Sequence, residues 1–226
     1  GMEVSFGLYL KEIEKFGRNG YLDEYRKVAD EANKVDHDTW FHVDIANYYV
    51  ITGDYNMALK HLERRKSEDA VYQTGYVSDL YWKAIIYKTK GNGEKSKQLF
   101  EDALEDVNDK LEGLPDDARV LFSKGKILAY LDRKEEAIKN GEKAISRKSV
   151  KTDKLQGGDY NYHLAKIYVL VGDYDPAIQE LRKVYEVKPK NAWIGYLLHD
   201  AEMANIQDYP PFKDLITEIR KVQNLD

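Results

Sequence analysis

Apolar residues recur every three or four positions along most of this chain, a spacing that places them on one face of an α-helix. Two such runs flank a polar Gly-Asp-Tyr corner at 172–174. Small and apolar residues follow the corner at helical spacing, at Ala177, Leu181 and Val184, and Pro189 comes after them. The pattern predicts two antiparallel helices joined by a tight turn.

The order of helix, corner and helix occurs five times. The second helices open at equivalent residues that lie 34, 38, 41 and 40 positions apart, namely Glu24, Ala58, Ser96, Ala137 and Ala177. In four copies a small residue of the first helix precedes a large one by three positions, at Ala46/Tyr49, Ala84/Tyr87, Gly125/Leu128 and Ala165/Tyr168. Because one helix pair cannot bury its apolar stripe alone, the copies must stack. The sequence therefore predicts an all-α array of about five helix pairs.

These copies resemble the tetratricopeptide repeat, in frames of about 5–38, 39–72, 77–110, 118–151 and 158–191. The last frame matches the family pattern best, at Leu164, Ala165, Tyr168, Gly172, Tyr174, Ala177, Leu181 and Pro189. The hallmark Trp of the first helix is replaced throughout, and insertions separate several frames. The resemblance implies a right-handed superhelical solenoid over 1–204, followed by a closing segment at 205–226 with a capping helix near 212–222.

The C-terminal half has a narrower resemblance, carried by "LDRKEEAIKNGEKAI", "YNYHLAKIYVLVGDYDPAIQELRKV" and "DYPPFKDLITEIRK" in that order. It is similar to the repeat region attached to bacterial signalling proteins that contain nucleotide cyclases, Ser/Thr kinases or winged-helix regulators. That group closes with an Asp-Pro-Arg-Phe-like segment, whereas this chain has Tyr-Pro-Pro-Phe at 209–212. The resemblance implies a regulatory module of a larger bacterial signalling protein.

Composition restricts the partners and the compartment. The 226 residues are 33% charged, with a mean hydropathy of -0.66, which suits an extended shape with much solvated surface. The net charge of -5 argues against nonspecific nucleic-acid binding, which needs a basic surface. No apolar run approaches the roughly 20 residues that span a bilayer, so we expect no membrane segment. The absence of cysteine is compatible with the cytoplasm, where we expect the protein to be.

Motifs for catalysis or for cofactors are not found. The Gly-Asp-Tyr corner recurs at 53–55, as expected of a structural turn rather than of a single active site. The segment "GNGEKSK" at 91–97 lacks the glycine and lysine spacing of a phosphate loop. The histidines are scattered, and His61 is expected on a solvated helix face. We predict no catalytic residues, no cofactor and no metal site.

The candidate binding site comes from counting along the frames. The fifth residues are Tyr9, Val43, Tyr81, Phe122 and Tyr162, and the residues four positions later are Ile13, Asn47, Ile85, Lys126 and Lys166. Residues four apart share a helix face, and in tetratricopeptide arrays this face lines a concave groove that binds peptides. The predicted groove residues are Trp40, Asn47, Tyr81, Phe122, Lys126, Tyr162, His163 and Lys166. The alternative is that the aromatic residues only pack between repeats.

One known version of this groove is not expected here. The chaperone-binding subgroup of the family binds a C-terminal carboxylate with a Lys/Asn clamp in its opening repeats. The corresponding positions in this chain hold Tyr9, Ile13 and Asp44, and only Asn47 is suitable. The clamp is therefore predicted to be absent.

The leading hypothesis is a non-enzymatic scaffold that binds a peptide or a partner domain in the groove. A second hypothesis is a structural module that self-associates, for instance as a homodimer, by continuing the stack at an exposed terminal repeat. An enzyme would require a deep closed pocket with convergent ionisable groups, which no motif indicates.

Overall fold

The computed structural model describes residues 41–64, 69–71, 75–147, 157–187 and 194–223, and near the N-terminus the helical residues 23, 26, 27 and 29. Most of the predicted frame 5–38, and the candidate groove residue Trp40, lie outside the described residues. Within the described ranges no helix is both long enough and apolar enough to cross a bilayer.

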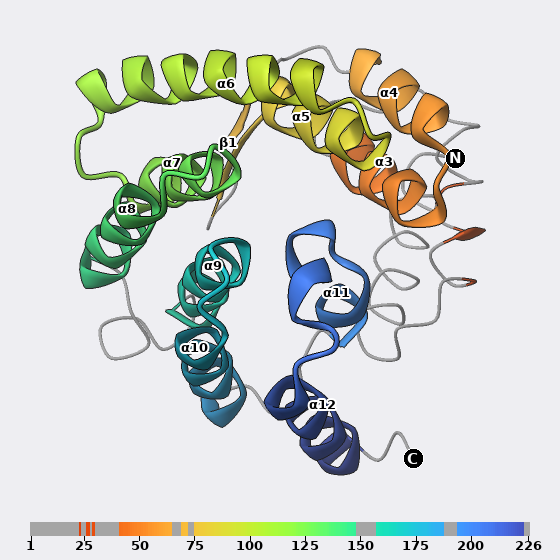
Figure 1. The fold of residues 1–226 in the computed structure, drawn as a ribbon, viewed down its shortest axis with the longest axis vertical. Coiled ribbons are helices and arrows are strands. Elements are labelled where there is room, and N and C mark those ends of the chain that lie inside the picture. Colours follow the sequence, from red (N-terminus) through yellow and green to blue (C-terminus); the bar gives the residue numbers. More distant parts are fainter. Residues whose placement is uncertain are drawn as a thin grey trace, which may run out of the picture.

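Helices make up most of the described structure, and eight of them form four antiparallel pairs (Figure 1). The pairs are α3 (Phe41–Thr52) with α4 (Tyr55–Glu63), α5 (Asp79–Thr89) with α6 (Gly93–Gly113), α7 (Ala118–Tyr130) with α8 (Lys134–Arg147), and α9 (Gly157–Leu170) with α10 (Tyr174–Val187). They are followed by α11 (Ile194–His199), the 3₁₀ helix η2 (Ala201–Ile206) and α12 (Pro210–Gln223). The predicted all-α solenoid with a C-terminal capping helix is confirmed.

The pairs follow one another around an arc, and α11 lies on its inner side (Figure 1). Helices α5, α7 and α9 are the first helices of consecutive pairs, and α9 contacts η2 directly. Helix α12 packs against α10 and ends the stack. The boundary that we predicted at residue 204 falls within η2 and stays a prediction.

The corners between paired helices lie where the sequence predicts them. Gly53, Gly91 and Gly172 have positive φ angles of 80°, 79° and 80°, and Asp132 holds the equivalent place with a φ of 59°. This left-handed conformation favours glycine because other residues carry a Cβ atom that clashes with the backbone. Next to the corner, Asp54 caps α4 by accepting a hydrogen bond from the Met57 amide at 3.1 Å.

Small residues bring neighbouring pairs into close contact, as the Gly125/Leu128 pattern predicts. A Cβ atom added at Gly125 would lie 2.6 Å from Ile167 Cδ1 and 3.0 Å from the backbone oxygen of Ala137. At Gly141 an added Cβ would lie 2.8 Å from side-chain atoms of both Leu164 and Ile167. Helices α7, α8 and α9 therefore meet at these two glycines.

Two of the insertions between repeats fall at least partly within the described residues, and they adopt different forms. Helix α6 is extended to 21 residues and so takes up the start of the insertion that follows it. The insertion before α5 instead forms an antiparallel ribbon of β1 (Asp69–Val71) and β2 (Tyr76–Ser78), which the sequence pattern did not predict. The ribbon leads into α5 through Ser78, whose hydroxyl caps the helix by accepting from the Tyr81 amide at 3.2 Å.

The expectation that His61 is solvated is wrong. His61 is fully buried in α4, and its Nδ1 lies 3.0 Å from Nδ1 of His42 in α3. The ring of Tyr49 stacks on it, with 5.4 Å between the ring centroids. Burial, together with the neighbouring His42, lowers the pKa of His61 to about 4. His61 is therefore a neutral core residue that links the two helices of its pair.

Candidate functional site

A short segment after the last helix pair lies against the inner face of the array. It consists of α11 and η2, residues Ile194–Ile206, and we call it the strap. Its apolar side chains Ile194, Leu197, Met203 and Ile206 are buried and belong to one core with side chains of α9, α10 and α12. The strap is thus packed against the array rather than exposed on its surface.

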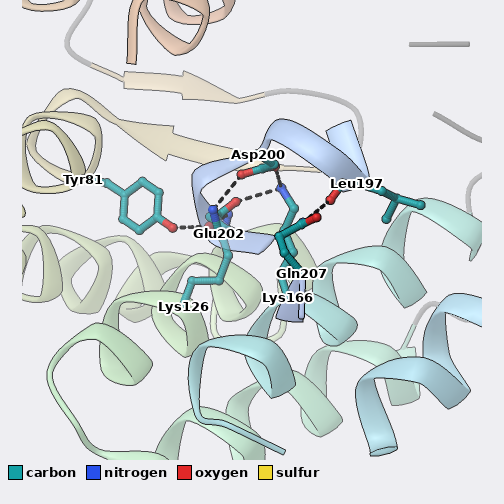
Figure 2. Close-up of polar contacts among 7 residues, drawn as sticks. All are labelled: Tyr81, Lys126, Lys166, Leu197, Asp200, Glu202 and Gln207. Carbon is teal, nitrogen blue, oxygen red and sulfur yellow. Dashed lines mark hydrogen bonds and ion pairs between the residues drawn. The ribbon is translucent and has the colours of Figure 1, made fainter. Parts of the chain in front are cut away.

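Two carboxylates project from the strap at alternate positions, Asp200 and Glu202 (Figure 2). One oxygen of Asp200 caps η2 by accepting a hydrogen bond from the Glu202 amide at 2.9 Å. This bond orients both side chains, because it ties the first carboxylate to the backbone of the residue that bears the second. Asp200 and Glu202 are only 5% and 2% exposed, so each needs a charged partner.

The partners come from the first helices of three consecutive pairs. The Tyr81 hydroxyl of α5 donates a hydrogen bond to Glu202 Oε1, and Lys126 Nζ of α7 lies 3.1 Å from the same oxygen. Lys166 Nζ of α9 lies 2.7 Å from Glu202 Oε2 and 2.6 Å from Asp200 Oδ2. Figure 2 shows these side chains converging on the two carboxylates, and we call the five residues the carboxylate cluster.

The repeat explains why the two lysines meet. Lys126 and Lys166 are the ninth residues of the frames predicted at 118–151 and 158–191, and stacked repeats align equivalent positions in a column. Tyr81 is a fifth residue of its frame, one helical turn before the lysine position. The Lys126 ammonium also lies 5.0 Å from the centroid of the Tyr81 ring, within cation-π range.

Opposite charges within the cluster affect the pKa values of Glu202 and of the two lysines. Burial alone would raise the pKa of Glu202, but the charges of Lys126 and Lys166 hold it well below its usual range. Burial lowers the pKa of Lys126, and Glu202 opposes that effect. For Lys166 the attraction to the carboxylates outweighs the effect of burial, because Asp200 and Glu202 raise its pKa well above the usual value. Glu202 is therefore ionised at neutral pH and held by two cations.

Tyr81 acts in the cluster as a neutral donor. Burial raises the pKa of its hydroxyl well above the usual value, and the Glu202 charge raises it further. The ring packs edge-on against Phe100 and Tyr130, at centroid distances of 5.9 and 6.1 Å. These contacts hold the ring in place, with its hydroxyl directed at Glu202.

Other predicted groove residues lie away from the carboxylates. Phe122 is buried between Tyr160 and His163, at ring-centroid distances of 5.8 and 5.5 Å, and joins α7 to α9. This arrangement is the alternative in which aromatic residues pack between repeats. His163 is half-buried beside Phe122. Asn47 is buried in α3, where its Oδ1 atom has no hydrogen-bond partner among the described residues.

Tyr162 lies at the edge of the cluster. It is half-buried, and its ring centroid is 4.7 Å from Lys166 Nζ. Its hydroxyl oxygen is buried and makes no hydrogen bond within the described parts of the chain. Of the predicted groove residues, the structure thus brings Tyr81, Lys126 and Lys166 together on the strap and places Tyr162 beside them.

Asp200 and Glu202 were missed by the reading of the sequence. They belong to no repeat, and no acid pair stands out among 40 carboxylates. The available signal was local, since the acids alternate in "LLHDAEMANI" between apolar residues, directly after an array whose predicted groove carries lysines. A segment with that pattern can bury its apolar side chains only if cations meet the acids.

Two surface hollows among the described residues lie away from the cluster. One, of about 550 Å³, is an open hollow beside α6 and the α7–α8 corner, with Glu101, Glu105 and Arg133 in its lining. The other, of about 220 Å³, lies between α10 and α12. Neither contains a residue of the carboxylate cluster, whose charged groups contact one another directly. Among the residues that the structure describes, no group of three His, Asp or Glu is placed to hold a metal ion.

Comparison with known proteins identifies part of the array. The family model of the tetratricopeptide repeat matches residues 118–150 and 158–191. No curated protein matches the chain. Repeats of this family generally mediate protein–protein interactions and are typically non-catalytic scaffolds. The helix pairs α7–α8 and α9–α10, which supply both lysines of the cluster, are therefore tetratricopeptide repeats.

Proposed function

We propose that this chain is a non-enzymatic scaffold that binds a peptide or a partner domain on the inner face of its array. One observation carries the proposal: this face already holds a segment of chain, the strap, through side chains from α5, α7 and α9. Hydrogen-bond donors on aromatic and lysine side chains suit an extended or helical segment. The charges of the cluster are used in recognition and not in a reaction.

We further propose that the module regulates a larger bacterial signalling protein in the cytoplasm. Support comes from the order of motifs in the C-terminal half and from the Tyr-Pro-Pro-Phe segment at 209–212. Tyr209 donates a hydrogen bond to Asp175 of α10, and Phe212 is buried in the core shared with the strap. The segment thus fixes the end of the strap to the last repeat.

Selection of peptides from a random display library on the full chain tests the scaffold function. We expect enriched peptides whose affinity falls at least tenfold on Tyr162→Ala, because Tyr162 is the half-buried aromatic residue at the edge of the cluster. The matched control is Tyr55→Ala, which removes a half-buried tyrosine at the α3–α4 corner. Failure to enrich any peptide, or equal losses in both variants, would contradict the proposal.

Self-association remains a second candidate because of the surface at the end of the stack. The hollow between α10 and α12 is lined by Tyr185, Leu215, Ile219 and Val222, and Val222 is 55% exposed. Two copies that meet there would cover this apolar surface. Light scattering over a range of concentrations tests it: a dimer that Val222→Asp dissociates supports the idea, and a monomer at every concentration removes it.

A further inference from the structure

The donors of the inner face lack an acidic counterpart of their own. Every ion pair that Lys126 and Lys166 make among the described residues is with Asp200 or Glu202 of the strap. The Tyr81 hydroxyl likewise donates to Glu202. Without the strap, helices α5, α7 and α9 would present two ammonium groups and a phenol at one place. Such a surface selects carboxylates over neutral or basic side chains.

Geometry makes the site specific for two carboxylates rather than one. Lys166 bridges Asp200 Oδ2 at 2.6 Å and Glu202 Oε2 at 2.7 Å, while Lys126 and Tyr81 both contact the other oxygen of Glu202. A segment with a single acid would leave at least one buried lysine without a counter-charge, which is costly. The spacing of one residue between the acids follows from the cap that Asp200 forms on η2.

Apolar contacts on both sides of the acids complete the pattern. Leu197 lies three residues before Asp200, and Met203 and Ile206 lie one and four residues after Glu202. All three are buried in the core that the strap shares with α9, α10 and α12. The inner face therefore recognises a segment with two acids separated by one residue. An apolar residue lies three positions before the first acid, and another directly follows the second.

One donor beside the site is not used by the strap. The hydroxyl oxygen of Tyr162 is buried next to Lys166 and has no hydrogen-bond partner in the described ranges. A buried hydroxyl without a partner is destabilising. A segment that offered one more acceptor at this position would gain a hydrogen bond that the strap does not make.

We propose that the strap is an internal ligand of the inner face, and that the external partner is an acidic protein segment with the same pattern of alternate carboxylates between apolar residues. This inference rests on the proposed scaffold function and names its class of partner. Because the strap belongs to the same chain, its effective concentration at the site is high. An acidic segment displaces it only if it supplies both the carboxylates and the apolar contacts, so the strap also protects the site from acidic peptides in general.

Competition between the strap and an added copy of it tests the inference. The probe is a fluorescein-labelled peptide with the sequence of residues 194–209, titrated with the full chain and followed by fluorescence anisotropy. In the chain variant Asp200→Asn/Glu202→Gln the resident strap is weakened, while Lys126, Lys166 and Tyr81 are unchanged. We expect this variant to bind the peptide at least tenfold more tightly than the wild-type chain does. The peptide with the same two substitutions should bind neither chain.

Controls keep the outcome decisive. Should the double variant fail to fold, as judged by circular dichroism, Met203→Ala weakens the strap without touching the charges and carries the same expectation. Equal binding of the acidic and the amide peptide, or no binding to a folded variant, overturns the inference. A variant that dimerises by exchanging straps also overturns it, because the occupant would then be a second copy of the chain.

Failure of this inference can be told from failure of the scaffold function. Display selection can yield peptides whose binding depends on Tyr162 but which lack the acid pair. That result would support the scaffold function and contradict the proposal of an acidic partner. If selection yields no peptide on any variant, the scaffold function falls as well.

Discussion

Glu202→Gln should lower the free energy of unfolding by about 3–5 kcal/mol, the usual cost of removing one partner from a buried ion pair. The substitution keeps the size of the side chain but leaves Lys126 without a counter-charge in a buried site, while Lys166 keeps only its ion pair with Asp200. For a chain of this size, the corresponding fall in Tm is roughly 10 °C. Thermal and urea unfolding followed by circular dichroism measure the effect.

The matched control is Glu105→Gln, which removes an exposed carboxylate from the middle of α6. Surface charges of this kind change stability by less than about 0.5 kcal/mol. Equal effects of the two substitutions would mean that Glu202 is not buried among cations.

The stability of the chain at acidic pH should also depend on Glu202. The pKa of Glu202 is lower in the folded chain than its ordinary value of 4.5, because Lys126 and Lys166 stabilise the ionised form. The contribution of Glu202 to the free energy of unfolding is therefore present above about pH 4.5. It is lost as the pH falls below that value towards the pKa of the folded state. Between pH 6 and pH 3 the Tm of the wild-type chain should fall more steeply than that of Glu202→Gln, and parallel curves would contradict this.

Gly125→Ala should lower the free energy of unfolding by about 1–3 kcal/mol, as overpacked substitutions in tight cores do. Helix propensity alone predicts a gain of about 1 kcal/mol for the same change, so the sign of the effect is informative. An added Cβ would meet the backbone oxygen of Ala137 at 3.0 Å as well as Ile167 Cδ1 at 2.6 Å. A backbone atom cannot move aside as the end of a side chain can, so α7 and α8 would have to separate.

Two other glycines provide the controls for thermal unfolding. At Gly141 an added Cβ meets only side-chain atoms, at 2.8 Å, and we expect a smaller loss than at Gly125. At Gly113, the last residue of α6, nothing lies within 4 Å, and alanine should be neutral or stabilising. A Gly125→Ala variant that is as stable as Gly113→Ala would disprove the close contact between pairs.

The fold could be predicted because its signals are local and repeated. A residue with positive φ at each corner and a small residue opposite a large one leave marks in the sequence at every repeat, as at Gly53, Gly172 and Gly125. The repeat also predicts that Lys126 and Lys166 share a face, because equivalent positions stack. Local pattern was thus sufficient for the corners within repeats and for the close contacts between neighbouring repeats.

The rest depends on contacts that occur once. Asp200 and Glu202 contact lysines 34 or more positions earlier in the chain. The strap is not a copy of the repeat, so no equivalent repeat position relates these acids to the lysines. By residue type, His61 was expected to be exposed. It is buried instead, and its ring nitrogen contacts that of His42 on the paired helix. The ribbon β1–β2 is specified by pairing between two strands of three residues, too short for an alternation of apolar residues to be recognised.

The inner face of the array binds a segment of chain, the strap, through buried lysine–carboxylate contacts. A double-mutant cycle between Lys126 and Glu202 tests it most directly, because the ion pair that Lys126 makes in the described structure is with Glu202, at 3.1 Å. The stabilities of the wild-type chain, Lys126→Met, Glu202→Gln and the double variant are measured by urea unfolding at pH 7. We predict a coupling energy of at least about 1.5 kcal/mol. Losses that add to within about 0.5 kcal/mol would show that the strap is not held by this contact, and would contradict the account.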